Sequence, residues 1–426
     1  MKRAYINGVI LDGTENMEPQ RDRVIITDGD RISAIVDRKA DLSGCELVDL
    51  GGSYIMPGLV DLHIHIPSSG KPKKGGTDYK KLEKLLNSSK LVVKGLGIID
   101  RGLIRQELMG GTTTVRALGG VFHLDTELRD MIDAGRLTGP RILASDYAVS
   151  VPGGHMTGTV ALAAHSVEEA VAMVDDLHAH GVDQIKLMIT GGVLDAEVPG
   201  EPGTLKMPEE YVKAAVERAH GYGLTVAAHV EGTEGMVIAL RNGVDTIEHG
   251  GKPSEEAIRL FKETGATLTA TLSPAAQYSA LEERPEGMSE IEYLNGKALF
   301  ANMVECIKAC REAGVRVGIG TDTGCPCVAH YDTWRELYWY HKFIGVSNRE
   351  ALHTATQVNA EILGRGDVFG TIEPGKSADM IVTEGDPLED LRALRKVTKV
   401  VFRGELIEKP AVKRYAAADA ALDKLM

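Results

Sequence analysis

Four histidines, a lysine and an aspartate in this 426-residue chain follow short apolar runs and could together bind metal ions. His63 and His65 are two residues apart, so both imidazoles project to the same side of an extended strand. Imidazole and carboxylate groups are ligands that zinc, manganese and iron accept. A His-x-His pair alone could equally be two hydrogen-bonded histidines on a solvated rim, but candidate ligands follow other runs too. The full candidate set is His63, His65, Lys186, His229, His249 and Asp322.

Lys186 is the unusual member of this set, because an ammonium group would repel two metal dications. A lysine buried in the mouth of a barrel loses its charge through desolvation. The neutral amine can then add carbon dioxide and become a carbamate, an anion able to bridge two metals. The alternative is a lysine that pairs with a carboxylate such as Glu248, or binds an acidic substrate, beside a single metal ion.

Strand-length apolar runs alternate with helical patterns between about Tyr54 and Gly364, which is typical of βα units around a parallel sheet. The expected strands are Ile55–Leu62, Thr112–Ala117, Arg141–Ser145, Gln184–Met188, Thr225–Ala228, Thr246–Ile247, Thr267–Ala270 and Arg316–Gly320. The expected helices include Ser166–His180, Pro208–Tyr222, Glu255–Thr264 and Asn295–Ala313. The pattern predicts a closed (β/α)₈ TIM barrel, in which working side chains lie at the carboxyl ends of the strands.

Both ends of the chain carry a different pattern of short strands and turns. The expected strands are Ala4–Leu11, Val24–Thr27, Arg31–Val36 and Leu47–Asp49 near the start, and Ala378–Thr383 and Lys396–Phe402 near the end. We therefore predict one small β-sandwich domain made of residues 1–54 and 365–426. The barrel, residues 55–364, is inserted between its two halves.

The composition argues against several classes of protein. Hydrophobic residues make up 43% and charged residues 26%, as in folded globular proteins. The net charge of −13 argues against nucleic-acid binding, and we interpret the basic stretch Lys71–Lys84 as a solvated loop. The start lacks the apolar core of a signal peptide, and no run of about 18 apolar residues follows. We expect a cytoplasmic protein without a membrane partner. Its five sparse cysteines, including Cys325-Pro-Cys327, are expected to be reduced thiols and not a metal site.

The constellation of candidate ligands resembles the amidohydrolase superfamily over nearly the whole chain. The segment IMPGLVDLHIH, which ends at His65, resembles the first-strand motif of that superfamily. The segment GTIEPGKSAD, which ends at Asp379, and the following Asp386-Pro387-Leu388 resemble its return into the sandwich. The resemblance implies two divalent metal ions, expected to be zinc. His63, His65 and Asp322 would bind the more buried ion, His229 and His249 would bind the second, and carboxylated Lys186 would bridge them.

Three further segments resemble the prolidase-like branch of this superfamily. They are GGTTTVR, ending at Arg116, Gly153-Gly154-His155, and Ile185-Lys186 followed by Thr190-Gly191-Gly192. That branch includes peptidases that release a C-terminal Lys or Arg and hydrolases of other N-acyl amino acids. It often has a second histidine two residues after the strand-five ligand, where this chain has Glu231. The departure puts the substrate in doubt more than the metal site.

Such a site is suited to the hydrolysis of C–N bonds. Two metal ions turn a bridging water into hydroxide near neutral pH and polarise a carbonyl. Asp322 could take the proton of the water and pass it to the leaving nitrogen. We therefore expect a metal-dependent amidohydrolase or metallopeptidase that acts on a dipeptide or an N-acyl amino acid, assembled as a homo-oligomer. The alternatives are a cyclic amide hydrolase or deaminase similar to imidazolonepropionase, and a non-catalytic binding barrel, which would be expected to lack ligands.

The candidate substrate-binding residues lie at or just beyond the ends of the predicted strands. They are His155, Glu231, Tyr278, His330 and Arg116. Each has a structural alternative. The two histidines could be partly exposed loop residues, and the tyrosine could cap its loop. The glutamate could accept a backbone hydrogen bond, and the arginine could bind a substrate carboxylate or form a structural ion pair.

Overall fold

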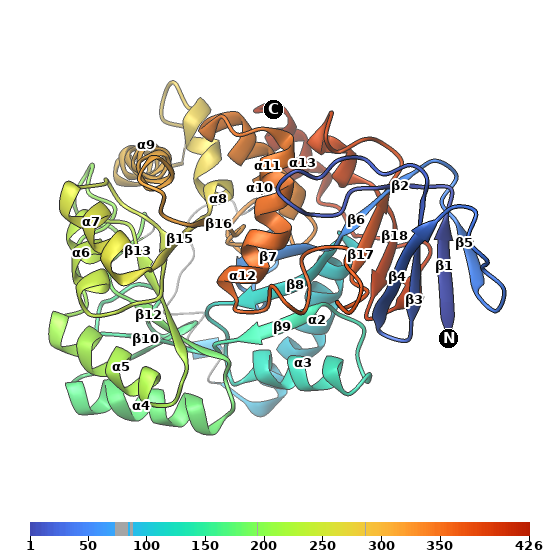
Figure 1. The fold of residues 1–426 in the computed structure, drawn as a ribbon. Coiled ribbons are helices and arrows are strands. Elements are labelled where there is room, and N and C mark those ends of the chain that lie inside the picture. The colour runs from blue at the N-terminus through green and yellow to red at the C-terminus, as the bar shows by residue number, and fades with distance from the viewer. Residues whose placement is uncertain (73–83, 86–87, 194, 286) are drawn as a thin grey trace.

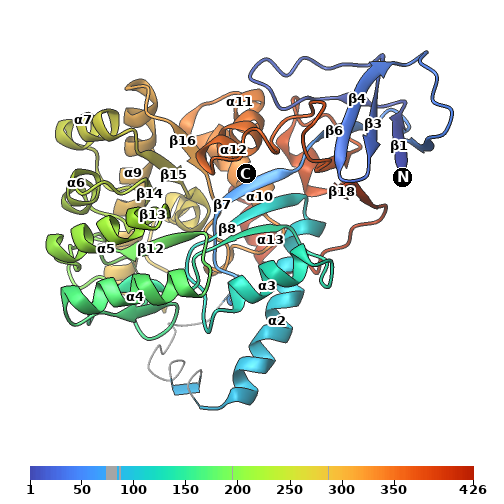
Figure 2. The same ribbon diagram turned by 60° about the horizontal axis from the view of Figure 1, so that its bottom comes forward.

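The computed structural model describes residues 1–72, 84–85, 88–193, 195–285 and 287–426 (Figure 1). The basic stretch Lys71–Lys84 falls mostly outside these residues. Strands and helices alternate through the middle of the chain, whereas both ends form sheets on one side of the molecule (Figures 1 and 2). Within the described residues no helix is both long and apolar enough to span a membrane.

The middle of the chain forms the predicted (β/α)₈ barrel. In the described residues its strands are β7 (Leu59–Ile64), β8 (Thr112–Ala117), β9 (Arg141–Ala144) continued by β10 (Ala148–Ser150), β12 (Gln184–Met188), β13 (Thr225–Val230), β14 (Thr246–His249), β15 (Thr267–Ala270) and β16 (Val317–Ile319). Neighbouring strands pair in parallel from β7 to β9 and from β10 to β16, and β11 (Ala161–Ala163) pairs with β10. The N–H of Asp322 donates to His63 O at 2.7 Å and the N–H of His65 donates to Thr323 O at 2.7 Å. These bonds join the first strand to the segment that follows the last one.

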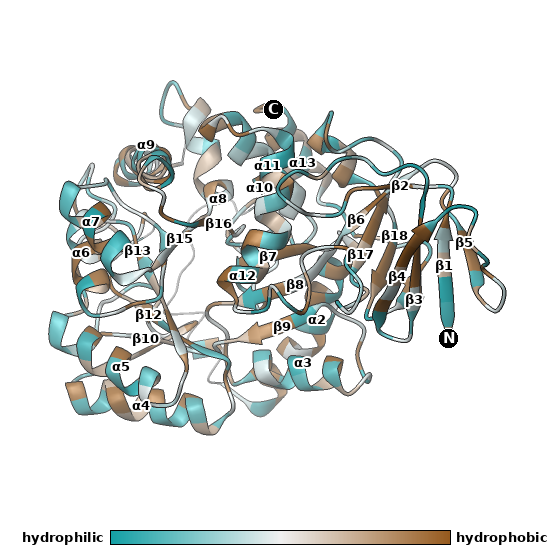
Figure 3. Ribbon diagram, viewed as in Figure 1, coloured by the Kyte–Doolittle hydropathy of each residue, from teal (hydrophilic) through white to brown (hydrophobic). Residues whose placement is uncertain are grey.

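Helices surround the barrel. The described α-helices are α2 (Lys90–Met109), α3 (Leu124–Asp133), α4 (Val167–Ala179), α5 (Glu209–Gly221), α6 (Thr233–Arg241), α7 (Glu255–Thr264), α8 (Leu272–Ala276), α9 (Glu290–Glu312), α10 (Thr333–Trp339), α11 (Asn348–His353), α12 (Asn359–Ile362) and α13 (Ala416–Asp423). Serine side chains cap α4, α7, α9 and α11 by accepting a backbone N–H three residues on. The outer helices mix hydrophilic and hydrophobic residues, whereas β17 (Met380–Thr383) and β18 (Val397–Phe402) are mostly hydrophobic (Figure 3).

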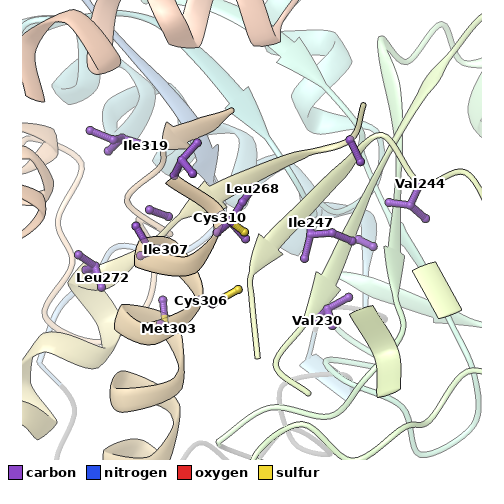
Figure 4. Close-up of a cluster of buried hydrophobic side chains, with 14 of the residues drawn as sticks. Val230, Val244, Ile247, Leu268, Leu272, Met303, Cys306, Ile307, Cys310 and Ile319 are labelled. Atoms are coloured by element: carbon purple, nitrogen blue, oxygen red, sulfur yellow. The ribbon is translucent and has the colours of Figure 1, made fainter. Parts of the chain in front are cut away.

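The outward faces of the strands pack against these helices. Figure 4 shows Ile247 and Leu268 of the barrel strands near Cys306 and Cys310, which lie one turn apart on α9. All four side chains are fully buried. The apolar side chains thus lie between the strands and the helices, whereas polar residues lie at the carboxyl ends of the strands.

The two ends of the chain build two facing sheets. The first has the order β4 (Arg31–Asp37), β3 (Arg23–Asp28), β1 (Lys2–Ile6), β5 (Glu46–Asp49). The second has the order β19 (Glu405–Ile407), β18 (Val397–Phe402), β17 (Met380–Thr383), β6 (Tyr54–Pro57), β2 (Val9–Ile10). Tyr5, Ile25, Ile55, Met380 and Val401 form part of one buried cluster, to which both ends contribute. The fold class is thus the predicted one, and the residue limits of the two domains stay a prediction.

Some predicted elements differ from the observed ones. The predicted strand Ile55–Leu62 is two strands, because β6 pairs with β17 at the chain end and β7 begins the barrel. Gly58 separates them, and a Cβ there would lie 2.2 Å from the Thr113 side chain. The helix predicted to begin at Asn295 begins at Glu290, because Ser289 caps it.

Candidate active site

The fold brings the six predicted ligands to one end of the barrel. His63 lies on β7 and His65 directly follows it, Lys186 lies on β12, His229 on β13 and His249 at the end of β14, and Asp322 follows β16. The ring centroids of His63 and His249 are 4.9 Å apart, and those of His229 and His249 are 4.7 Å apart. The carboxyl ends of parallel strands meet at the same face of a barrel, which explains why residues far apart in the sequence converge here.

Each of the four histidines uses one ring nitrogen to contact a protein acceptor. Such a contact fixes the orientation of an imidazole and leaves its other nitrogen available to a metal. The pairs are His63 Nδ1 with Glu248 Oε2 (2.8 Å), His65 Nδ1 with Gly119 O (3.1 Å), His229 Nε2 with Gly191 O (3.2 Å) and His249 Nδ1 with Thr271 Oγ1 (2.6 Å).

Asp322 faces the nitrogens that these contacts leave available. Its Oδ1 lies 3.1 Å from His65 Nε2 and 3.6 Å from His63 Nε2. His63, His249 and Asp322 offer ligand atoms that all lie within 4.8 Å of one another. Burial by itself raises the pKa of Asp322, but the neighbouring His63 and His65 hold it well below its usual range. Asp322 and His249 both have positive φ angles, 55° and 69°, a conformation that Asp and His adopt more readily than most non-glycine residues.

Lys186 has the properties expected of a lysine that could be carboxylated. Its side chain is fully buried, and Nζ has no hydrogen-bond partner among the described residues. Burial lowers its pKa to about 8. The alternative partner Glu248 accepts hydrogen bonds from His63, Arg116 and Thr246 instead. A buried amine without a partner fits the carbamate better than it fits a lysine paired with Glu248.

Arg116 forms the structural ion pair, one of the two predicted alternatives. It is 3% exposed, and its Nη2 donates to Glu248 Oε1 at 2.7 Å. Its other contacts are with Leu62 O, Thr246 Oγ1 and Thr269 Oγ1. These contacts occupy the guanidinium, so Arg116 is not placed to bind a substrate carboxylate.

His330 is not the partly exposed loop residue considered from the sequence. It is 1% exposed, its Nδ1 lies 2.9 Å from Glu107 Oε1, and its Nε2 lies 2.7 Å from Ser68 O. Burial lowers its pKa to about 4. Neither ring nitrogen is left for a substrate, so we do not retain His330 as a substrate-binding residue.

Two other predicted substrate residues lie beside the strand-five ligand. His155 stacks on His229 with ring centroids 4.1 Å apart, and its Nδ1 lies 3.0 Å from Asp195 Oδ2. One carboxylate oxygen of Glu231 lies 3.9 Å from His229 Nε2. The other is buried and has no hydrogen-bond partner among the described residues. Burial raises the pKa of Glu231 well above its usual value.

Tyr278 is mostly buried against Gly296. Its hydroxyl makes a long contact of 3.4 Å with Glu292. Burial and the nearby Glu292 raise its pKa, and Glu231 contributes as well. Tyr278 thus lies within electrostatic reach of the site without contacting a candidate ligand.

Sequence reasoning missed several residues that support the site. Asp61 accepts the backbone N–H of His63 and of Thr321, each at 3.0 Å, and thereby fixes the first strand against the last. The thiol of Cys325 lies 3.4 Å from Asp322 Oδ2. Asp61 belongs to the motif that carries His63. A charged residue within such an apolar strand could have indicated a structural role from the sequence alone. The closeness of Cys325 to Asp322 also had a signal, because the two residues are three apart in the sequence.

Imidazoles, a carboxylate and an amine meet at the carboxyl ends of the strands of a (β/α)₈ barrel, and the amine has no hydrogen-bond partner among the described residues. These features are those of a barrel enzyme whose site can hold metal ions. Residues 54–407 match the model of the amidohydrolase family. The chain belongs to that family. The resemblance noted in the sequence is thereby confirmed, and the protein is a hydrolase that acts on C–N bonds. The family generally binds a divalent metal ion.

Several known proteins are similar to this chain. A candidate prolidase from Bifidobacterium longum superposes with a TM-score of 0.87 at 34% identity, covering 100% of this chain and 98% of that one. A Xaa-Pro dipeptidase with methionine bound in its active site superposes with a TM-score of 0.83 at 29% identity, covering 96% and 100%. Ochratoxinase of Aspergillus niger is 27% identical over 439 residues, covering 95% of this chain and 86% of the relative.

Proposed function

We propose that this protein hydrolyses dipeptides or N-acyl amino acids with two zinc ions at the mouth of the barrel. His63, His65 and Asp322 would hold the more buried ion, and His229 and His249 would hold the other. Lys186 would bridge the two as a carbamate.

One observation carries the proposal: the buried Lys186 amine, which has no hydrogen-bond partner among the described residues, lies within electrostatic reach of His63, His229 and His249. These histidines and His65 each keep a ring nitrogen available. A buried polar group without a partner is costly, so such a group in a native site calls for a missing partner. Carboxylation would supply negative charge where the neighbouring imidazoles can bind metal. The complete set also argues against the non-catalytic barrel, which would be expected to lack ligands.

When bound, divalent metal ions lower the pKa of a water molecule and polarise a substrate carbonyl. Asp322 is the chain's own group for moving the proton, since its carboxylate is held below its usual pKa and therefore begins the reaction ionised. It would accept a proton from the attacking water and deliver it to the leaving nitrogen. Glu248 and Gly119 keep His63 and His65 in fixed orientations meanwhile.

The side chains near the mouth favour a substrate with a cationic group. Arg116 is occupied by Glu248, so its charge is already compensated. Within the described part of the chain, one oxygen of Glu231 has no hydrogen-bond partner, and Asp195 holds His155 nearby. An amine or guanidinium of the substrate would stabilise the ionised form of Glu231, which burial otherwise disfavours, and would form a charge-assisted hydrogen bond with it. This arrangement supports a peptide that carries Lys or Arg.

The decisive experiment is a screen of dipeptides, N-acyl amino acids and cyclic amides on metal-analysed enzyme, with amine and ammonia products measured separately. We expect release of a free amino acid, fastest for peptides with a basic residue. Ring opening or ammonia release would instead identify a cyclic amide hydrolase or deaminase. No turnover of any substrate by the fully metallated protein would contradict the proposal.

We further propose that the protein acts in the cytoplasm as a homo-oligomer and binds only small molecules. The net charge of −13 argues against a nucleic-acid partner, and a small-molecule substrate is consistent with a hydrolase family. Cell fractionation and sedimentation velocity of the purified protein would test the two points. Recovery in the membrane or secreted fraction, or a monomer at all concentrations, would contradict them.

A further inference from the structure

Glu336 is a buried carboxylate of α10 that contacts the segment supporting His249. Its side chain is 0% exposed and accepts three hydrogen bonds from residues that follow β15. The donors are the backbone N–H of Leu272 at 2.6 Å, the backbone N–H of Ser273 at 2.7 Å and the Ser273 hydroxyl at 2.5 Å. The residue directly before these donors is Thr271, whose hydroxyl contacts His249.

We propose that Glu336 positions His249 for metal binding by holding Thr271, the residue that His249 contacts, in place. The inference rests on the proposed function, because it takes His249 to be a metal ligand. Glu336 acts through Thr271 and would touch neither the metal nor the substrate, so it is a positioning residue. Its role is to fix the orientation of one imidazole at the mouth of the barrel.

The contact between His249 and Thr271 determines which ring nitrogen is available to a metal ion. His249 Nδ1 lies 2.6 Å from Thr271 Oγ1, and Thr271 is 1% exposed. When Nδ1 carries the proton and donates to the threonine oxygen, Nε2 keeps its lone pair. A partner of this kind fixes both the tautomer and the orientation of a metal-binding imidazole. The position of the Thr271 hydroxyl is therefore a property of the metal centre.

That position depends on the backbone to which Glu336 is bonded. Thr271 follows Ala270, the last residue of β15, and directly precedes α8. The backbone N–H groups at the start of a helix have no partner within the helix. Glu336 accepts two of these groups, from the two residues after Thr271. A buried donor without an acceptor is costly, so removal of the carboxylate should make the segment move and carry the Thr271 hydroxyl away from His249.

The same helix also contacts the support of a second candidate ligand. Thr333, one turn before Glu336 on α10, donates from its hydroxyl to Asp61 Oδ2 at 3.3 Å. Asp61 accepts the backbone N–H of His63 through its other oxygen. The helix α10 thus joins the end of β15 to the first barrel strand, β7. This link holds His249 in a fixed place relative to His63, whose ring centroid lies 4.9 Å from that of His249.

The test measures metal retention by the purified, metal-loaded, full-length protein. Samples are dialysed against buffers of decreasing free Zn²⁺ concentration, and the zinc that remains is measured by elemental analysis. Glu336→Gln replaces one acceptor oxygen by an amide donor that faces backbone N–H groups. One of the bound ions should therefore be released at a free Zn²⁺ concentration about 10- to 100-fold higher than in the unmodified protein, the usual effect of losing an outer partner.

A second measurement separates positioning from a general loss of stability. After exchange of zinc for Co²⁺, the visible absorption spectrum of Glu336→Gln should differ from that of the unmodified protein, because His249 meets the ion in another orientation. The matched control is Asp379→Asn, which alters a buried carboxylate whose side chain contacts Arg141 and Arg403 instead. The control should retain its ions and its spectrum even if it is less stable.

Thr271→Val tests the other half of the path, since it removes the hydroxyl that His249 contacts. It should weaken the same ion, and the double variant with Glu336→Gln should be no weaker than the weaker single variant, because both changes act through one contact. Ser273→Ala removes one of the three hydrogen bonds and should weaken that ion to a smaller extent. It replaces Glu336→Gln in the comparison if that variant does not fold.

His249→Ala distinguishes failure of this inference from failure of the proposed function. It should lose one ion, and full metal content in that variant would overturn the assignment of His249 as a ligand and the positioning role with it. If His249→Ala does lose an ion, unchanged retention and an unchanged Co²⁺ spectrum in the folded Glu336 or Ser273 variant would overturn the positioning role alone. Equal losses in Asp379→Asn would do the same.

Discussion

Among single residues, the buried amine of Lys186 is the most sensitive test of the proposed metal centre. Lys186→Ala removes the only group that could become the bridging carbamate, so the variant should lose at least one metal and most of its activity. Short carboxylic acids should restore part of the activity by occupying the vacated space. The exposed Lys213, on α5, is the control, and Lys213→Ala should change neither property. Full metal content and unchanged turnover in Lys186→Ala would eliminate the carbamate.

Asp322 has a different role in the proposal, because it moves a proton as well as binding metal. Asp322→Asn keeps the shape of the side chain but cannot accept the proton, so turnover should fall by about 10²- to 10⁴-fold, the usual contribution of general acid–base catalysis. The Michaelis constant should change little, since proton transfer contributes to the transition state. Metal analysis of the variant must accompany the kinetics. Near-normal turnover with full metal content would assign the proton transfer to another group.

Glu231 tests the specificity, because its unpartnered oxygen is proposed to pair with a cationic substrate group. A desolvated pair of this kind is worth about 1.5 to 3 kcal/mol. Glu231→Gln should therefore reduce kcat/KM for basic substrates about 10- to 100-fold more than for neutral ones, with the metal content intact. Equal losses for all substrates, or a best substrate that is anionic, would show that Glu231 does not recognise a cation.

Among the elements, the sequence predicted the positions of the strands better than their partners. Hydrophobic runs located β8 and β12 to the residue. The same runs could not show that Ile55–Leu62 crosses from one sheet to another, because both parts are apolar. The sequence likewise placed Arg116 at the end of a strand and His330 in the loop beyond the last strand, but their burial depends on Glu248 and Glu107, which come from distant segments. The local sequence pattern determines which face of a strand a side chain lies on. Tertiary contacts determine whether that side chain is free to contact a substrate.

The contact between Arg116 and Glu248 links β8 to β14 beneath the proposed metals, and its removal should affect both stability and metal binding. Arg116→Met leaves a buried carboxylate without its cation, which should lower the free energy of unfolding by about 3 to 5 kcal/mol. Metal affinity should fall about 10- to 100-fold, because Glu248 also orients His63. Urea unfolding and metal titration measure the two effects.

The double variant Arg116→Met with Glu248→Leu separates the charge effect from a simple packing defect. It removes both charges together, so it should unfold at a higher urea concentration than Arg116→Met alone. Its metal affinity should remain low, since Glu248→Leu removes the carboxylate that contacts His63 Nδ1. If Arg116→Met is as stable as the unmodified protein, Arg116 is not the structural cation that the contacts indicate.

In the whole molecule, the GTIEPGKSAD segment joins the sheets of the chain ends to the barrel. Arg141, at the start of β9, donates from Nη1 to Asp379 Oδ2 at 2.9 Å, and its guanidinium lies 4.6 Å from the centre of the Phe369 ring. Asp379 Oδ1 also accepts the N–H of Arg403, at the turn between β18 and β19. The motif recognised from the sequence thus ends in a carboxylate that connects three segments, which spacing alone could not reveal.

Asp379 is 5% exposed, so replacing it should destabilise the protein without touching the site. Asp379→Asn weakens a charge-assisted contact with Arg141, and contacts of this kind contribute about 1.5 to 3 kcal/mol. We expect a loss of that size in the free energy of unfolding, with kcat/KM per folded molecule unchanged. Glu373→Gln, in the same segment, is the matched control, because Glu373 pairs with Lys376 at the surface and should contribute less than about 1 kcal/mol. Equal stabilities for the two variants, or a selective loss of activity in Asp379→Asn, would show that this carboxylate does not act as the structural link between the chain ends and the barrel.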